Sequence, residues 1–264
     1  MRIDATDAHT TVDAFVGATG SRRVADLFTD TDGHYVARGL AAGRYRVSAG
    51  GPGFFGIGGT GFAASAPLDV DVKDGQRTSG VDFDLEPGGA VRGTVTKPDG
   101  GPCAGASIFV VDANASAEPF AQMMTEAEGT FEVSGLAAGT HVVIARATGY
   151  APAIEHGVRV HAEEKTDVSL RLTHGANLTV VVTDAAGTTL SGAKVTLTDP
   201  SGIALNQYLG LDEIMKKLGG SSTEHDLGEL AAGDYTLVVS KDGKSATTAV
   251  HHGGDAQTVT VALP

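Results

Sequence analysis

The chain has no tryptophan and one cysteine, and its acidic side chains outnumber the basic ones. A single cysteine cannot build a disulfide framework within one chain, and we expect Cys103 to be a small exposed thiol in a loop. With 32 acidic against 19 basic residues, the formal net charge of -13 would repel nucleic acid and anionic membrane surfaces. No apolar run reaches about 18 residues, so we expect no membrane insertion.

Catalytic and metal-binding motifs are also missing. The sequence holds no Gly-x-Ser-x-Gly elbow, no His-Glu-x-x-His helix and no phosphate-binding loop. Asp30-x-Asp32-Gly33 could begin a calcium loop, but no glutamate follows at the required distance, so we interpret it as a turn. Adjacent His251 and His252 would point to opposite faces of a strand. We therefore predict no enzyme activity, no catalytic residues, no cofactor and no metal site.

What the chain does contain is a repeated turn. Residues 39–43 read Gly-Leu-Ala-Ala-Gly, residues 135–139 repeat them, and residues 229–233 read Glu-Leu-Ala-Ala-Gly. Each copy is followed by an alternating segment, which predicts a tight connection between two β-strands. We expect the leucine to point inward and the last glycine to supply a backbone angle that a Cβ forbids.

The spacing of other landmarks around this turn is constant, which predicts three tandem modules. We place them at residues 1–87, 88–173 and 174–264. Short strands separated by turns about every ten residues are typical of an antiparallel sandwich. The predicted fold is thus all-β, a rod of three seven-stranded antiparallel Greek-key β-sandwich modules.

The first module departs from the pattern at its start and in one loop. Only ten residues precede the expected strand Thr11–Val16, so a full opening strand is lacking and a sheet edge would be left unpaired. Either Arg2–Thr6 forms a stub, or the chain is the downstream part of a longer repeat array, which we favour. Residues 50–62 form a glycine- and phenylalanine-rich loop insertion.

The third module carries the only helical pattern. Apolar residues recur at steps of three and four over residues 211–218, and Gly219-Gly220 follow as a stop signal. We predict a short amphipathic helix that lies on the sandwich, with a partner-binding helix as the alternative.

These residues resemble the carboxypeptidase regulatory-like domain, a transthyretin-like (prealbumin-like) sandwich. The second module carries the pattern most fully, in Val91–Val95, Asp99–Pro102, Gly105-Ala106, Thr125 and Gly129–Phe131, with His141 in the usual place of a tyrosine. The first module shows Thr29 to Tyr35 and Tyr45, and the third shows Gly192-Ala193 and Tyr235. The third has Glu224–Leu227 in place of the Thr-x-x-x-Gly-x-Phe element, which makes its middle strand the least secure.

The resemblance implies a non-catalytic accessory, adhesive or carbohydrate-binding-like unit of a secreted or surface protein. We interpret the chain as a structural spacer or adhesive segment, extracellular or at a cell surface, whose partners are a protein or glycan there and neighbouring repeats of a longer parent chain. The alternatives are a carbohydrate-binding module and an accessory domain of a larger secreted enzyme. Because exposed aromatic rings stack on sugars or pack between modules, the candidate contact residues are Phe54, Phe55, Phe62 and Tyr150.

Overall fold

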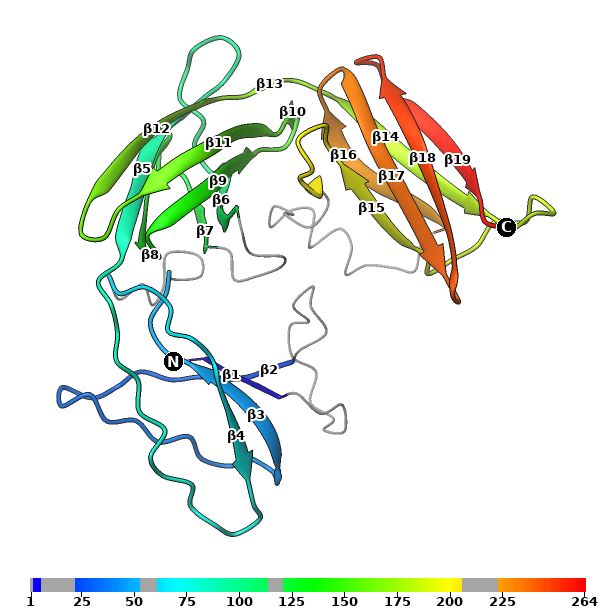
Figure 1. Cartoon of the computed structure of the whole chain (residues 1–264). Helices are drawn as coiled ribbons and strands as arrows, with labels where there is room; N and C mark the ends of the chain where they lie inside the picture. The colour runs from blue at the N-terminus through cyan, green and yellow to red at the C-terminus, as the bar shows by residue number, and fades with distance from the viewer. Residues whose placement is uncertain (1, 6–21, 53–60, 114–120, 206–222) are drawn as a thin grey trace.

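The computed structural model describes residues 2–5, 22–52, 61–113, 121–205 and 223–264 (Figure 1). Every named element in these ranges is a β-strand, which confirms the all-β fold class. None of the described residues forms a helix with the length and apolar character that a bilayer crossing requires. The helix expected at 211–218 lies outside the described residues, as does the strand expected at 11–16.

The N-terminal group of strands forms one sheet of order β2-β1-β3-β4. Its strands are β1 (Arg2–Ala5), β2 (Arg22–Asp26), β3 (Gly43–Ser48) and β4 (Leu68–Val72). All three neighbouring pairs are antiparallel. In the segments 27–42 and 73–86 that accompany this sheet, the described residues form no strand.

The central group has two sheets, of order β11-β9-β6-β7 and β12-β5-β8, and a small β10-β13 pair. The first sheet consists of β6 (Ser107–Asp112), β7 (Ala121–Met124), β9 (Gly139–Arg146) and β11 (Ala153–Val160). The second consists of β5 (Gly89–Thr96), β8 (Thr130–Leu136) and β12 (Lys165–Arg171). The small pair is β10 (Tyr150–Ala151) with β13 (Thr173–His174).

The C-terminal group also has two sheets, of order β16-β14-β19 and β15-β17-β18. Its strands are β14 (Ala176–Thr183), β15 (Lys194–Thr198), β16 (Glu224–Leu230), β17 (Gly233–Lys241), β18 (Lys244–His252) and β19 (Gln257–Ala262). The middle strand of the third module, for which the sequence pattern gave the weakest support, therefore does form, as β16. Figure 1 shows the three groups following one another along a curve, where the sequence predicted a rod.

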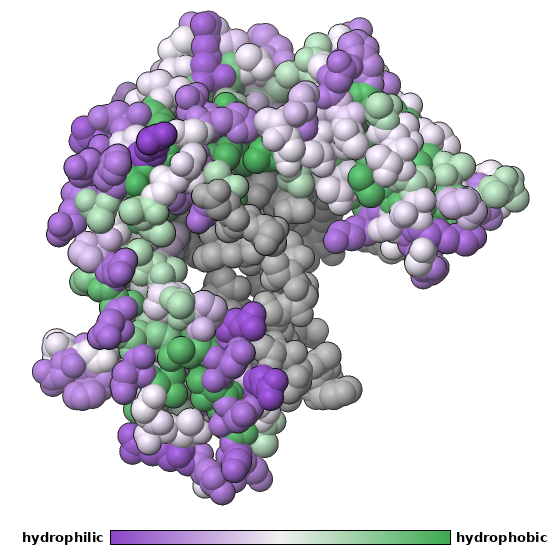
Figure 2. Space-filling model, in the orientation of Figure 1, coloured by the Kyte–Doolittle hydropathy of each residue, from purple (hydrophilic) through white to green (hydrophobic). Residues whose placement is uncertain are grey.

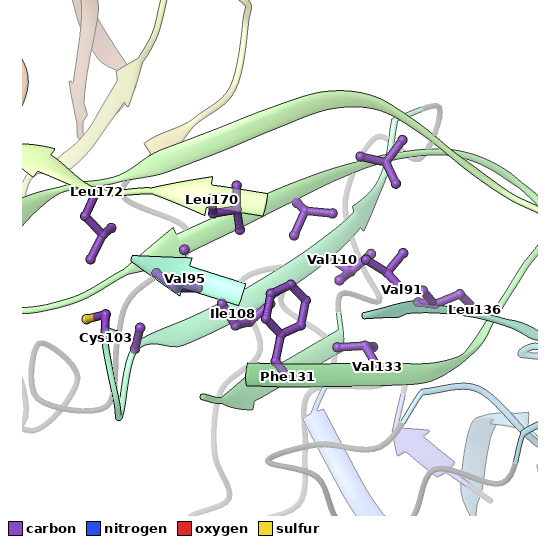
Figure 3. Packing of buried hydrophobic residues seen from close by; sticks show 14 of the residues in the cluster. Val91, Val95, Cys103, Ile108, Val110, Phe131, Val133, Leu136, Leu170 and Leu172 are labelled. Atoms are coloured by element: carbon purple, nitrogen blue, oxygen red, sulfur yellow. The ribbon is translucent and has the colours of Figure 1, made fainter. Parts of the chain in front are cut away.

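The central group and the C-terminal group each have an apolar core of their own. Strands such as β8 and β14 alternate between more and less buried residues, so one face of each sheet packs on the other. Figure 3 shows the central core, in which Val91, Val95 and Phe131 meet Ile108 and Leu170 between the two sheets. The β6 strand is buried along nearly its whole length, in agreement with its continuous apolar run.

A parallel pair of strands in each of these two groups departs from a purely antiparallel sandwich. The first and last strands run in parallel in the central group, where β5 pairs β12, and in the C-terminal group, where β14 pairs β19. The first strand of each group is therefore an interior strand with neighbours on both sides. It contributes side chains to the centre of the core, including the fully buried Val91 and Val180.

The repeated turn connects one sheet to the other. In the central group it leads from β8 to β9, and in the C-terminal group from β16 to β17. Its leucine points inward as predicted, because Leu136 and Leu230 are 3% and 0% exposed. The prediction for the last glycine holds in one copy of three, because Gly139 has a φ of 153°, whereas Gly43 and Gly233 have no positive φ in the region that favours glycine.

The left-handed angle belongs to an earlier glycine. In the first two copies of the turn it is at Gly39 and Gly135, with φ of 74° and 76°. In the third copy it moves to Gly228, one residue before Glu229, with φ of 80°. Gly135 is the extra residue of a β-bulge opposite Gly89 and Ala90, a conformation that glycine adopts without a steric penalty.

Two further expectations are corrected. Cys103 is not exposed but 3% accessible, within the central core, because the loop that carries it folds back onto β5 through a hydrogen bond from its backbone nitrogen to the Val95 oxygen. Arg2–Ala5 is not a stub of the opening strand. It is β1, hydrogen-bonded on both sides, and it occupies the position that β6 holds in the central group.

Candidate functional site

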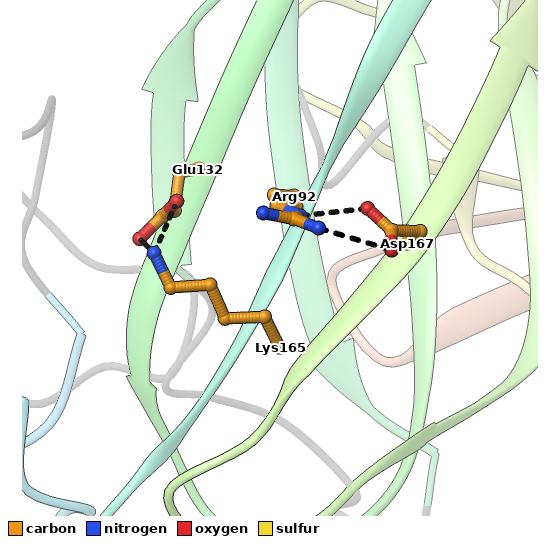
Figure 4. A network of polar contacts seen from close by, with 4 residues as sticks. All are labelled: Arg92, Glu132, Lys165 and Asp167. Atoms are coloured by element: carbon orange, nitrogen blue, oxygen red, sulfur yellow. Dashed lines mark hydrogen bonds and ion pairs between the residues drawn. The ribbon is translucent and has the colours of Figure 1, made fainter.

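Charged side chains gather on the outer face of the central β12-β5-β8 sheet (Figure 4). Arg92 of β5 contacts Asp167 of β12 at 2.7 Å. Lys165 of β12 extends across β5 and contacts Glu132 of β8 at 2.7 Å. The Arg92 guanidinium lowers the pKa of Asp167 below its usual value. These side chains are exposed and already paired across strands, so we interpret them as sheet contacts of small energy.

The residues proposed as the start of a calcium loop form a turn. Asp30 Oδ1 accepts hydrogen bonds from the backbone nitrogens of Asp32 at 3.0 Å and His34 at 2.8 Å. These bonds, the one from His34 first, lower the pKa of Asp30. Asp184 and Asp199 accept the same pair of backbone bonds in the C-terminal group. A repeated structural turn therefore accounts for this acidic cluster.

The adjacent histidines diverge as the strand periodicity predicted. His251 lies on the surface with its Nδ1 2.7 Å from Asp234, whereas His252 is fully buried. A third histidine, His156, lies 3.1 Å from the Ser201 hydroxyl. That hydroxyl donates to Asp199 at 2.7 Å. A hydrolytic triad needs its carboxylate on the histidine, so this trio does not have the geometry of one.

The four aromatic candidates are not gathered in one site by the described residues. Phe54 and Phe55 lie outside those residues. Phe62 is 43% exposed and bridges Pro87 in the segment that leads into β5. Tyr150 is half-buried in β10, packs against the central core and places its ring 6.3 Å from that of His174. Phe62 and Tyr150 thus accompany two different junctions between strand groups.

The junction of the N-terminal and central groups is built from backbone. Gly88 donates its backbone hydrogen bond to the Gly61 oxygen at 2.8 Å. A Cβ on Gly135 would lie 2.8 Å from the Gly51 oxygen and 3.0 Å from the Phe62 oxygen. Only glycine allows the two groups to approach this closely.

The junction of the central and C-terminal groups is built from side chains. The Arg146 guanidinium, which is 6% exposed, donates to the Leu205 oxygen at 2.9 Å. Ser201 and His156 make a second contact at 3.1 Å. The backbone nitrogen of Gly149 makes a third, donating to Glu229 Oε1 at 3.2 Å. Three separate polar contacts thus link the second group to the third.

Apolar side chains complete that junction. On the outer face of the central four-stranded sheet, Phe109 and Ile144 are 1% exposed and form a cluster with their neighbours. Ile154 and Ile203 pack against this cluster and against the C-terminal core as well. Sequence reasoning missed this surface. The available signal was the unbroken apolar run of β9, whose second face had to be covered by something.

The central group matches a known family model. Residues 90–173 match the family model of the carboxypeptidase regulatory-like domain. This match confirms the resemblance for the second module. A search of curated proteins finds no match to the chain.

Several solved structures are similar at low identity. The Bacillus anthracis TIE protein is 13% identical over 99% of this chain and 47% of that chain, with a TM-score of 0.27. GBS52, the minor pilin of Streptococcus agalactiae, is 14% identical over 66% and 95%, with a TM-score of 0.27. A type II cohesin–X-dockerin complex of Acetivibrio cellulolyticus is 21% identical over 33% and 58%, with a TM-score of 0.26. The chain thus spans about half the length of the first of these proteins.

Proposed function

We propose that this chain is a non-catalytic β-sandwich repeat segment of a secreted or cell-surface protein and that it acts as a spacer or adhesive segment. The three strand groups would be its modules, with boundaries at residues 87/88 and 173/174. The observation that carries the proposal is the side-chain junction between the central and C-terminal groups. A spacer has to hold its modules at a defined orientation, and buried contacts do this better than a flexible linker.

The junction has the features that such a role requires. The linker is short, because β14 begins at Ala176 and β12 ends at Arg171. Arg146 is buried where it crosses between groups, so loss of its hydrogen bond to Leu205 would remove a partner from a desolvated charge. The apolar contact of Ile203 with both clusters adds a second constraint that does not depend on charge. Together they support a fixed angle between the two modules.

Small-angle X-ray scattering of the whole chain tests this role. In Arg146→Met combined with Ile203→Ser, the buried arginine hydrogen bond and the apolar contact of Ile203 are lost, and we expect a broader distribution of maximum dimensions. The matched control is Arg159→Met, which removes an exposed arginine from β11 in the same group. Circular dichroism checks that both variants keep their β-structure. If the junction variant scatters like the wild type, the spacer role has lost its main support.

A glycan-binding module is the second candidate, and the exposed ring of Phe62 is the observation that favours it. Affinity electrophoresis against a set of polysaccharides compares the wild type with a Phe54→Ala/Phe55→Ala pair and with Phe62→Ala. Retention of the wild type that any of these variants abolishes would favour sugar binding over a spacer. If the chain is a spacer, we expect that neither the wild type nor any variant, including Tyr150→Ala, is retained by the polysaccharides.

A further inference from the structure

The central and C-terminal groups place a strand where the N-terminal group has none among its described residues. In the central group β5 lies between β12, to which it runs parallel, and β8, to which it is antiparallel. In the C-terminal group β14 lies in the same way between β19 and β16. The inward side chains of these two strands are fully buried, at Val91, Val95, Leu178, Val180 and Val182.

The segments that should flank such a strand are present in the N-terminal group. His34–Leu40 is the counterpart of β8. It follows a turn in which Asp30 and Gly33 make the same backbone hydrogen bonds that Glu126 and Gly129 make before β8. Val81–Leu85 is the counterpart of the end of β12, because it alternates like residues 168–172 and ends on the matching leucine.

Both flanking segments are extended but unpaired. Burial alternates residue by residue along 34–37 and along 81–85, as in a strand with one face on a core. Within the described part of the chain, no backbone hydrogen bond joins residues 35–38 or 81–85 to a neighbouring strand. We call the space between these two segments the open strand position.

Inward side chains beside the open strand position are less buried than their counterparts in the central group. Tyr35, Ala37 and Phe83 are only half-buried, and their counterparts Phe131, Val133 and Leu170 are 4%, 5% and 4% exposed.

Apolar exposure is concentrated in the same group. Of the five large apolar side chains that the structure describes as exposed, four precede residue 87: Phe28, Val36, Phe62 and Leu68. Figure 2 shows apolar side chains open to the surface of this part of the molecule. The exposed large apolar side chains that the structure describes thus lie mainly in the group that has the open strand position.

Tyr35 makes a side-chain hydrogen bond across the open strand position. Its hydroxyl donates to the Val81 oxygen at 2.6 Å. The residue in the place of Val81 in the central group is Val168, which pairs with Gly93 of β5. Tyr35 itself corresponds to Phe131, which has no hydroxyl and pairs with the same Gly93. Tyr35 thus satisfies a carbonyl that would otherwise face the absent strand.

We propose that the open strand position binds an extended segment of another polypeptide, parallel to residues 81–85 and antiparallel to residues 34–38. The two other groups define its chemistry. Apolar side chains at alternate positions would fill the core, as Val91 and Val95 do. Basic side chains between them would face the exposed carboxylates of Asp82 and Asp84, as Arg92 faces Asp167. Added strands of this kind gain affinity from main-chain hydrogen bonds and specificity from alternate side chains.

This proposal is independent of the spacer role, because it concerns the N-terminal group and not the junction between the other two. The test uses the full chain and a capped, fluorescently labelled peptide with the sequence of residues 89–96, Gly-Ala-Val-Arg-Gly-Thr-Val-Thr. Fluorescence anisotropy measures binding, and hydrogen exchange localises it. We expect binding together with new protection of residues 34–38 and 81–85.

Peptide variants test the chemistry of the occupant. A peptide with Val91→Asp and Val95→Asp places carboxylates in the core and should not bind. A Thr94→Lys peptide places an ammonium beside Asp82, because Thr94 pairs with Ser169, the counterpart of Asp82. It should bind about twofold more tightly at low salt, and the gain should disappear at high salt.

A protein variant separates a true strand site from non-specific adhesion. Tyr35→Phe frees the Val81 oxygen for the incoming strand and should strengthen peptide binding roughly fivefold, the equivalent of one hydrogen bond. Tyr150→Phe, which removes a hydroxyl from the central group, should leave binding unchanged. No binding to the folded chain overturns the proposal, as does protection of residues 81–85 without peptide in a chain that sediments as a monomer, because the chain's own residues would then fill the position.

Discussion

The hydroxyl of Tyr235 donates a hydrogen bond to the carbonyl oxygen of Ala231 at 3.0 Å, and Tyr45 makes the same bond to Ala41 at 2.8 Å. In both cases the tyrosine at the start of a strand ties that strand back to the turn before it. The central group has His141 at this position, and its buried Nδ1 has no hydrogen-bond partner. The tyrosine hydrogen bond thus stabilises the repeated turn in the N-terminal and C-terminal groups, and the central group lacks it.

Tyr235→Phe should lower the free energy of unfolding of the C-terminal group by about 1 kcal/mol, because the ring stays and one hydrogen bond is lost. Tyr45→Phe should act in the same direction on the N-terminal group. Hydrogen exchange along β17 and β3 measures each effect locally. Tyr150→Phe is the control, since its hydroxyl has no partner among the described residues. Equal exchange rates in Tyr235→Phe and wild type would contradict this role for the bond.

The central group should lose stability in mild acid. Burial lowers the pKa of His141 below its usual 6.5, although the nearby Asp112 carboxylate opposes the shift. The unfolded chain therefore binds the proton more readily than the folded one, so the stabilising contribution is present above pH 6.5 and is lost as the pH falls towards the folded pKa.

Urea unfolding at about pH 7.5 and about pH 5 measures this loss. A His141→Phe variant should show a smaller decrease than the wild type, because it has no proton to bind at that position. Exposed His161 provides the control, and His161→Gln should keep the wild-type decrease. A wild-type slope in His141→Phe would mean that other groups carry the acid sensitivity.

Gly135→Ala should be much more destabilising than Gly187→Ala. Both glycines have a left-handed φ, of 76° and 86°, so each substitution costs about 1 kcal/mol in backbone strain. Only at Gly135 would the Cβ also collide with backbone, since no atom lies within 4 Å of a Cβ at Gly187. Thermal unfolding compares the two variants. Similar melting temperatures would show that the N-terminal group does not contact Gly135 in solution.

Cys103 should react slowly with thiol reagents in the native chain. It is 3% exposed, and burial raises the pKa of its thiol. The loop around it is held by Thr125, whose hydroxyl donates to the Cys103 oxygen at 2.6 Å and accepts from the Ala106 nitrogen at 2.9 Å. Thr125→Val should accelerate the reaction about tenfold by easing local opening, whereas Thr94→Val on the exposed face of β5 should not.

Some features followed from local pattern alone. The alternation on either side of the repeated turn predicted strands, and its leucine predicted a core position, because both depend on the two-residue period of a strand. The resemblance in the central group depended on turn residues at fixed offsets, and the family model confirms it. The turn expected at Asp30 does form, since an aspartate that accepts hydrogen bonds from the backbone just after it is a local structure.

Other features depended on partners distant in sequence. The sequence could not show that Gly135 lies in a bulge opposite Gly89, nor that the side chain of Cys103 is buried in the central core. The four aromatic candidates were chosen for their residue type. Phe62 and Tyr150 lie at different junctions, and no local sequence pattern shows which junction a residue will join. Arg146 was missed because nothing in its neighbourhood distinguishes it from a surface arginine.

The sequence by itself determined an all-β chain with a repeated strand–turn–strand unit, because side-chain alternation and turn chemistry are local properties. Tertiary structure decided which strands became neighbours. It paired β5 with β12 in parallel and placed Arg2–Ala5 in the interior of a sheet. It also left Tyr35 facing the Val81 oxygen across a strand position that none of the described residues fills. These outcomes depend on contacts between residues far apart in the chain, whose energies no local pattern encodes.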